Sequence, residues 1–120
     1  MIETAMVIVV VFTVVFWIFE LGWLMYTYAV MADAANEGVR YAIVHSGADP
    51  TGTQTKVQTF AAASMHDVTA ISIAVTAPDG SYTPPNRVRV TVTYAYVPFL
   101  PKYIGAATMT TYAEGRMVAQ

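Results

Sequence analysis

The sequence predicts an α+β protein in which one long N-terminal helix carries a short second helix and a three-stranded antiparallel β-sheet. Three observations predict this fold: an uninterrupted apolar run at the N-terminus, a short segment with apolar residues three and four apart, and three later segments in which apolar and polar residues alternate. Alternating strands build a sheet with one apolar face, so we expect the second half of the long helix to cover that face. The expected shape is a lollipop with a bare helical stem.

The apolar run extends from Thr4 to Ala32, and Glu20 is its single charged residue. At the ~1.5 Å rise per residue of an α-helix the run spans about 43 Å, which exceeds the ~30 Å hydrocarbon thickness of a bilayer. Because it is apolar on every side, we expect lipid or copies of the same helix to surround it. The helical pattern continues to about Ser46, where Gly47 suits a left-handed cap.

The charges beside the run bear on its orientation in a membrane. No Lys or Arg precedes Arg40, so the positive-inside rule would place the Arg40 side in the cytoplasm. The strands and turns of the remainder are typical of an exported domain, which favours the opposite orientation and a basic leader that has been removed. We therefore expect a processed chain. The run lacks the basic segment, short apolar core and small-residue cleavage site of a secretory signal peptide.

A short amphipathic helix is predicted after the turn at Asp49-Pro50, with Thr53 or Thr55 as its N-cap. Its apolar and small residues lie three and four apart: Val57, Phe60, Ala61, Ser64 and Met65.

Three strands are predicted beyond this helix. Residues 71–76 and 87–96 alternate between apolar and polar side chains, and the turn-rich segment from Pro78 to Pro85 joins them. Pro98 and Pro101 end the second strand, because proline cannot donate to a ladder. The third strand, 107–116, places alternate residues on the outer face: Thr108, Thr110, Tyr112, Glu114 and Arg116.

The composition excludes several classes of function. The chain has 120 residues, of which 56% are hydrophobic and 12% charged, with a net charge of −2, so it has no basic footprint for nucleic acid. Zero cysteines exclude disulfides, thiolate catalysis and cysteine-bound zinc. The two histidines, His45 and His66, lack metal-binding spacing, and no serine lies in a nucleophile motif. We expect no cofactor and no enzymatic activity.

Two parts of the chain are expected: residues 1–46 as the long helix, and residues 47–120 as a small α/β head packed on its C-terminal half. A long apolar helix with a small sheet is the shape of type IV pilin-like proteins.

Specific segments resemble the TadE family of small pilin-like proteins of tight-adherence (Tad, or Flp-type) systems. Asn36 stands where family members often carry Arg, and Glu3 lies two residues nearer the start than the glutamate of processed pilins. The similarity covers nearly the whole chain and is carried by five segments: Glu3-Thr4-Ala5, Ile18 to Gly22, Ala34 to Ala42, Val90 to Tyr94, and Pro98-Phe99-Leu100-Pro101.

The resemblance implies a structural subunit that waits in the bacterial cytoplasmic membrane and polymerises with copies of itself into an extracellular pilus. A prepilin peptidase, a motor ATPase and a platform protein are implied as its machinery. Two alternatives remain open: a minor pseudopilin that primes or tips a pilus of another subunit, and a membrane-anchored module that binds a surface through its sheet or its Pro78–Pro85 loop.

The acidic residues of the helix are candidate assembly residues. Glu3 resembles the pilin glutamate that neutralises the N-terminal amine of a neighbouring subunit, although the helix dipole alone also favours an acid there. A charge at mid-bilayer costs roughly 2.5 to 3.5 kcal/mol, so Glu20 should face protein, be protonated or find a hydrogen-bond partner. An N-terminal amine or a hydroxyl of an adjacent helix could serve, the latter from Thr13, Thr27 or Tyr28.

Small residues and one ion pair complete the candidate set. Ala34, Gly38 and Ala42 form a stripe for close packing, against the chain's own sheet or another subunit, and Gly22 is a further packing position. Glu37 and Arg40, three residues apart, are placed to form an ion pair.

The outer face and the edges of the sheet offer further contacts. Arg87 and Arg89 are placed for a subunit contact with Glu114 or for solvent exposure. A three-stranded sheet also leaves two unpaired edges that must be blunted or paired.

Overall fold

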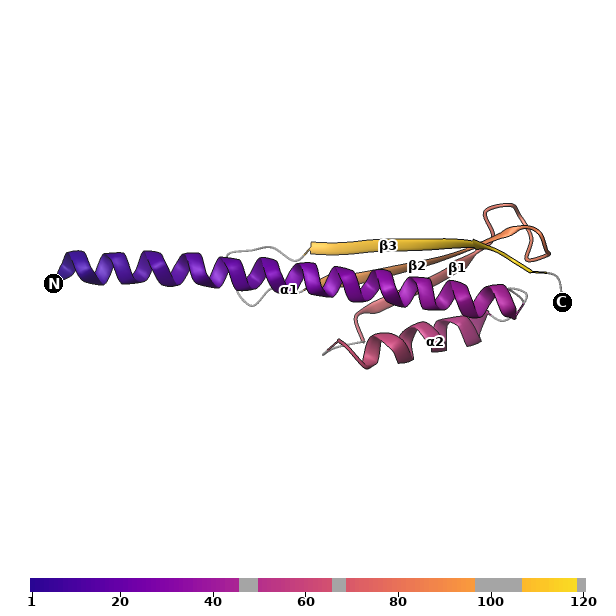
Figure 1. Ribbon diagram of the computed structural model, residues 1–120, viewed down its shortest axis with the longest axis horizontal. Coiled ribbons are helices and arrows are strands. Elements are labelled where there is room, and N and C mark those ends of the chain that lie inside the picture. The colour runs from indigo at the N-terminus through magenta and orange to yellow at the C-terminus, as the bar shows by residue number, and fades with distance from the viewer. Residues whose placement is uncertain (46–49, 66–68, 97–106, 119–120) are drawn as a thin grey trace.

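The computed structural model describes residues 1–45, 50–65, 69–96 and 107–118. Within these ranges the chain forms two helices followed by three strands, in the order that the sequence predicts. The molecule is a rod of 73 × 23 × 19 Å, because the N-terminal helix projects far beyond the other elements (Figure 1). The predicted α+β fold with its long apolar helix and small antiparallel sheet is confirmed.

Helix α1 spans Ile2–Val44 and is long and apolar enough to cross a membrane. Every residue up to Phe19 is exposed, and Glu20 is the first buried residue of the chain. The second part of α1 packs against the strands and the second helix. At the end of α1 the backbone N–H of His45 donates to the Tyr41 carbonyl at 3.1 Å. The predicted cap at Ser46 and Gly47 lies outside the described residues.

Helix α2 spans Pro50–Ala62, so it begins earlier than predicted and ends before Met65. The N-cap prediction was wrong: Thr53 is buried inside the helix, and the Thr55 hydroxyl donates to the Thr51 carbonyl at 2.9 Å. Pro50 suits the first helical turn, because its fixed φ is helical and an N–H there would have no intrahelical partner.

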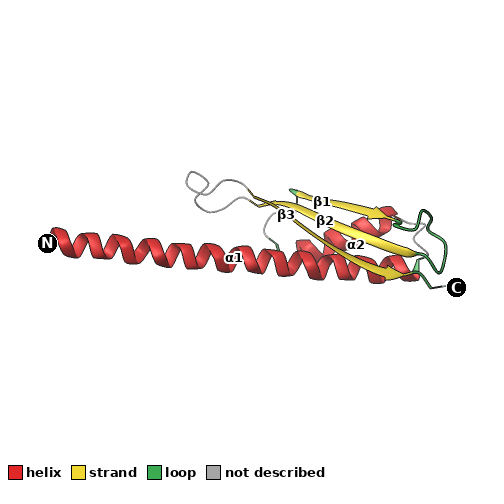
Figure 2. Cartoon of the chain, turned by 90° about the horizontal axis from the view of Figure 1, so that it is seen from above, coloured by secondary structure: helices red, strands yellow, loops and turns green. Residues whose placement is uncertain are grey.

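Strands β1 (Ile71–Thr76), β2 (Arg87–Tyr96) and β3 (Ala107–Arg116) form one antiparallel sheet with β2 in the middle. Figure 2 shows the three strands side by side along the second half of α1. The predicted alternation is confirmed: the side chains of Val88, Val90 and Val92 are fully buried, whereas the intervening residues of β2 lie on the outer face.

One hydrophobic core joins both helices to the same face of the sheet. Gly115 of β3 permits close contact with α1, because a Cβ at this position would lie 2.5 Å from Ile43 Cδ1 and 2.7 Å from Val39 Cγ1. The buried residues of the main cluster come from α1, α2 and β2: Met31, Ala34, Ala35, Val39, Val57, Ala61, Val90 and Val92.

Candidate functional site

The first part of α1 is an exposed apolar rod. Residues 2–19 are all exposed, and Glu3 is their only charged side chain. At the helical rise these residues span about 27 Å, close to the ~30 Å of bilayer hydrocarbon. Most of the exposed large hydrophobic side chains among the described residues lie on α1 before residue 29. A continuous apolar surface of this kind marks contact with lipid or with other proteins.

Glu20 marks the point where the head begins to cover the helix. The Tyr96 hydroxyl, at the end of β2, donates to Glu20 Oε1 at 2.7 Å. Only 7% of Glu20 and 2% of Tyr96 are exposed. Burial, together with the hydrogen bond to Glu20, raises the pKa of the Tyr96 phenol above its ordinary value, so the phenol keeps its proton and acts as the donor.

The sequence suggested hydroxyl partners for Glu20 on adjacent helices, and Tyr96 was not among them. Within the single chain the Thr13 and Thr27 hydroxyls donate to carbonyls of their own helix, four residues earlier, at 2.8 and 2.9 Å. A contact of Glu20 with an adjacent helix stays a prediction. The signal for Tyr96 was its place on the apolar face at the end of the second predicted strand. That pattern gives the face of the sheet but not the helical residue opposite it.

Gly22, two residues after the buried Glu20, lies on the exposed side of α1. A Cβ at Gly22 would meet no atom within 4 Å, so this position is open space in the single chain. The Trp23 and Tyr26 rings follow it, with centroids 5.7 Å apart, and the Tyr26 hydroxyl donates to the Ser64 carbonyl at 3.2 Å. These side chains border an apolar depression of about 640 Å³ lined by Ile18, Phe19, Gly22, Trp23 and Tyr26.

The stripe of small residues lies on the covered part of α1. Ala34 and Ala42 are fully buried. A Cβ on Gly38 would lie 2.4 Å from Val57 Cγ2 on α2 and 3.2 Å from Val90 Cγ1 on β2. In the single chain this stripe therefore packs against the chain's own head, and glycine permits α1 to contact α2 and β2 at one level.

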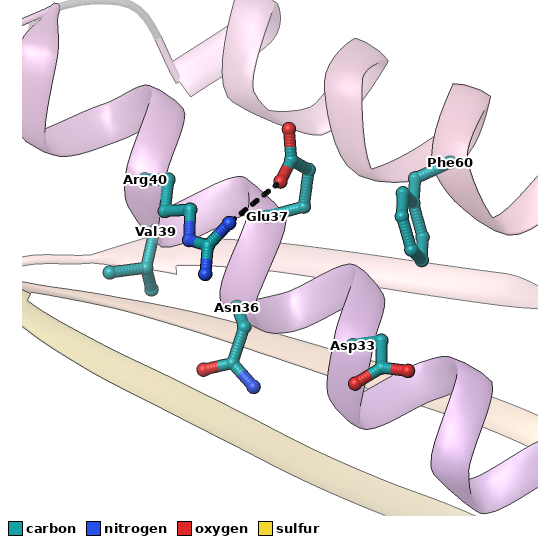
Figure 3. Close-up of a pocket in the computed structure, with 6 residues that line it drawn as sticks. All are labelled: Asp33, Asn36, Glu37, Val39, Arg40 and Phe60. Carbon is teal, nitrogen blue, oxygen red and sulfur yellow. Dashed lines mark ion pairs between the residues drawn. The ribbon is translucent and has the colours of Figure 1, made fainter.

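Glu37 and Arg40 lie at the junction of α1 with α2. Arg40 Nη1 is 4.0 Å from Glu37 Oε2, and the arginine side chain is largely exposed, so solvent weakens the pair. Figure 3 shows the two side chains beside a depression of about 360 Å³ between the helices, lined by Asp33, Asn36, Glu37, Val39, Arg40 and Phe60.

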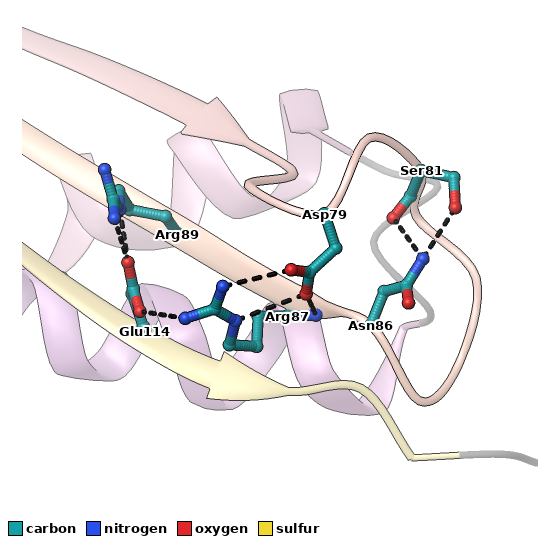
Figure 4. A network of polar contacts seen from close by, with 6 residues as sticks. All are labelled: Asp79, Ser81, Asn86, Arg87, Arg89 and Glu114. Atoms are coloured by element: carbon teal, nitrogen blue, oxygen red, sulfur yellow. Dashed lines mark hydrogen bonds and ion pairs between the residues drawn. The ribbon is translucent and has the colours of Figure 1, made fainter.

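A second polar cluster joins the loop after β1 to the outer face of the sheet (Figure 4). Asp79 Oδ1 lies 3.0 Å from Arg87 Nη2, and Asp79 Oδ2 accepts the backbone N–H of Arg87 at 2.9 Å. Glu114 of β3 binds Arg87 at 3.5 Å and also binds Arg89. Arg87 and Arg89 thus contact Glu114 within one chain.

The ion pair of Asp79 with Arg87 makes the stability of the head depend on pH. The side-chain hydrogen bond from Arg87, followed by its backbone N–H, lowers the pKa of Asp79 from 3.8 to about 2. Because the pKa of Asp79 is lower in the folded chain than in the unfolded chain, its carboxylate stabilises the fold at pH values above the unfolded pKa. This contribution is lost as the pH falls from about 4 to about 2.

We expect Asp79→Asn to reduce the slope of the free energy of unfolding against pH between about pH 4 and pH 2, measured by denaturant unfolding. An unchanged slope would contradict the assignment.

Some residues considered from the sequence lie outside the described residues: Asp49, His66, and the segment from Pro98 to Pro101. Across the ranges that the structure does describe, no group of three or more His, Cys, Asp or Glu side chains is placed to hold a metal ion.

Comparison with known proteins gives one result. Residues 1–40 match the family model described as TadE-like protein. No curated protein and no solved structure matches the chain. The matched residues contain the whole exposed part of α1, Glu20, and the helical segment that begins the contact with the head.

Proposed function

We propose that this chain is a pilin-like structural subunit that polymerises through α1 into an extracellular filament of the Tad, type IV-related kind. The observation that carries the proposal is the exposed apolar segment 2–19, which lies inside the part of the chain that is TadE-like. A soluble monomer would expose this segment to water, at a cost of about 25 cal/mol for each Å² of apolar surface.

In this proposal α1 exchanges one apolar environment for another. Lipid surrounds residues 2–19 while the chain waits in the bacterial cytoplasmic membrane, and α1 helices of other copies replace the lipid in the filament. Lipid tails are as apolar as the helix, so the exchange depends on packing and polar contacts between helices. Glu3, exposed in the first turn, would then neutralise the N-terminal amine of a neighbouring copy.

The membrane-embedded part ends at Glu20 in this arrangement. Residues 1–46 act as the stem and residues 47–120 as the head, and the contact of Glu20 with Tyr96 marks the point where the head begins to cover the stem. Trp23 and Tyr26 follow at once, and such amphipathic rings favour the headgroup level of a bilayer. Glu20 then lies at the hydrocarbon boundary, where its carboxylate avoids most of the cost of a mid-bilayer charge.

The two tryptophans test this boundary. Trp17, which is retained in Trp23→Phe, lies three residues, or about 4.5 Å, inside the boundary at Glu20, so we expect lipids brominated in the upper part of the acyl chain to quench it most. Trp23, retained in Trp17→Phe, should be quenched most by lipids brominated near the headgroup, because six residues of helix separate the two by about 9 Å. Equal depths, or a deeper Trp23, would contradict the proposed boundary.

Electron microscopy of extracellular material, with mass spectrometry of its protein, tests the function itself. Fibres composed mainly of this chain support the proposal. Fibres in which the chain is rare would indicate a priming or tip subunit, and a chain that stays in membranes without fibres would indicate an anchored binding module.

A further inference from the structure

The two edges of the sheet differ in how their backbone groups are satisfied. β2 is paired on both sides, whereas β1 and β3 each turn one row of N–H and C=O groups away from the sheet. Such a row is a template on which a strand of another chain can pair. The register of the ladders identifies the residues in each row.

The backbone N–H of Met117 donates to the Asn86 carbonyl at 3.0 Å. This bond continues the register of β2 and β3, in which hydrogen-bonded and non-hydrogen-bonded pairs alternate. The β3 residues whose backbone groups turn outward are therefore Thr108, Thr110, Tyr112, Glu114 and Arg116. The same alternation, carried through β2, turns the backbone groups of Ile71, Ile73 and Val75 outward from β1.

Two outward carbonyls of β1 accept hydrogen bonds from side chains of the same chain. Gln54 of α2 donates from Nε2 to the Ile73 carbonyl at 3.2 Å. Tyr82, in the loop after β1, donates from its hydroxyl to the Val75 carbonyl at 2.9 Å. Two consecutive outward acceptors of this edge are thus taken by groups of the same chain, and a strand could pair there only by displacing both.

The β3 edge has no such cover in the part of the chain that the structure describes. Residues 107–113 of β3 contain no proline and no charged residue, the residues that most often blunt an edge, whereas Glu114 and Arg116 follow at its C-terminal end. Thr108, Thr110 and Tyr112 are exposed, and none of their outward carbonyls accepts a side-chain hydrogen bond among the described residues. Among the described residues, one edge of the sheet is therefore closed and the other is open.

The orientation of the strands identifies the contact that the closed edge prevents. β2 ends at Tyr96, which contacts Glu20, so β2 runs against α1. β1 and β3 are antiparallel to β2 and therefore run with α1, as Figure 1 also shows. Copies that share one membrane orientation would bring the β3 edge of one alongside the β1 edge of the next as parallel strands. Such a head-to-tail contact repeats without closing.

We propose that Gln54 and Tyr82 are edge blocks, which prevent the β3 strand of one copy from pairing with the β1 strand of the next and so confine contacts between copies to the helices. The inference rests on the proposed function only in taking the copies to share one orientation. In this way α2 and the loop after β1 would prevent the sheet from growing from one chain to the next.

The test compares the full chain with the double variant Gln54→Ala, Tyr82→Phe in phosphatidylcholine vesicles. Hydrogen–deuterium exchange of the Thr108, Thr110 and Tyr112 amides is the measurement, because these N–H groups turn outward. We expect fast exchange in the wild type and, in the double variant, exchange slower by about tenfold or more as β3 becomes paired. The control Gln58→Ala, Tyr112→Phe removes similar atoms away from the β1 edge and should leave exchange at Thr108 and Thr110 fast.

A third substitution separates edge pairing from general destabilisation. Proline at position 110 removes an outward N–H and no ladder bond, so adding Thr110→Pro should restore fast exchange at Thr108 and Tyr112. The proposal is overturned if the double variant exchanges like the wild type, or if protection persists with Thr110→Pro. Amide exchange does not depend on fibre formation, so electron microscopy would reveal a failure of the filament proposal separately.

Discussion

Replacing Tyr96 with phenylalanine should destabilise the head by about 1 to 3 kcal/mol. The substitution leaves the shape of the ring but removes the phenol that donates to Glu20 at 2.7 Å. Removing one partner of a buried hydrogen bond costs about 1 to 3 kcal/mol. Because Glu20 is the first buried residue of α1, the loss falls at the junction of stem and head.

The free energy of unfolding of the full chain in detergent micelles measures this effect, with near-UV circular dichroism reporting on tertiary packing. Tyr112→Phe is the matched control, because Tyr112 is 61% exposed and lies on the outer face. It should change stability by no more than about 0.5 kcal/mol.

A double-mutant cycle then isolates the contact. Glu20→Gln replaces the carboxylate with a neutral amide, so Tyr96→Phe should cost less in that background than in the wild type. Equal effects of Tyr96→Phe and Tyr112→Phe, or no coupling between positions 20 and 96, would show that the hydrogen bond does not fix the head to the stem.

The order and bounds of the strands could be predicted because their signals are local. An alternating pattern such as Val88, Val90 and Val92 requires only that one face of the sheet be buried. The long helix could be predicted equally well, since no residue between Ile2 and Val44 breaks it. The start of α2 was missed, because threonine is a good N-cap and the same stretch also contains Pro50, which suits the first turn itself.

The contacts of the candidate residues could not be predicted, because each depends on which elements meet. Glu20 was recognised as a carboxylate in need of a partner, but Tyr96 is 76 residues away in the sequence. The hydrogen bond from Gln54 to the Ile73 carbonyl likewise depends on α2 lying beside β1. The small residue Gly38 was recognised as a packing position, whereas its neighbours Val57 and Val90 follow only from the fold.

The exposed stem should tolerate no charge at its centre. Val11 lies midway along the segment 2–19 and is exposed in the single chain. A lysine at the centre of a membrane helix costs about 2.5 to 3.5 kcal/mol on insertion scales. We therefore expect Val11→Lys to lower the ratio of membrane-inserted to non-inserted chain by about 100-fold, since each 1.4 kcal/mol is a factor of ten.

Membrane fractionation and electron microscopy of cells that express Val11→Lys measure the two consequences, insertion and fibre formation. Val118→Lys is the matched control, because Val118 is an exposed valine of the head and should insert and assemble like the wild type. The described part of the head buries no residue before Glu20, so Val11→Lys should unfold with wild-type cooperativity. Normal insertion and normal fibres with Val11→Lys would mean that neither lipid nor a neighbouring helix surrounds this part of α1.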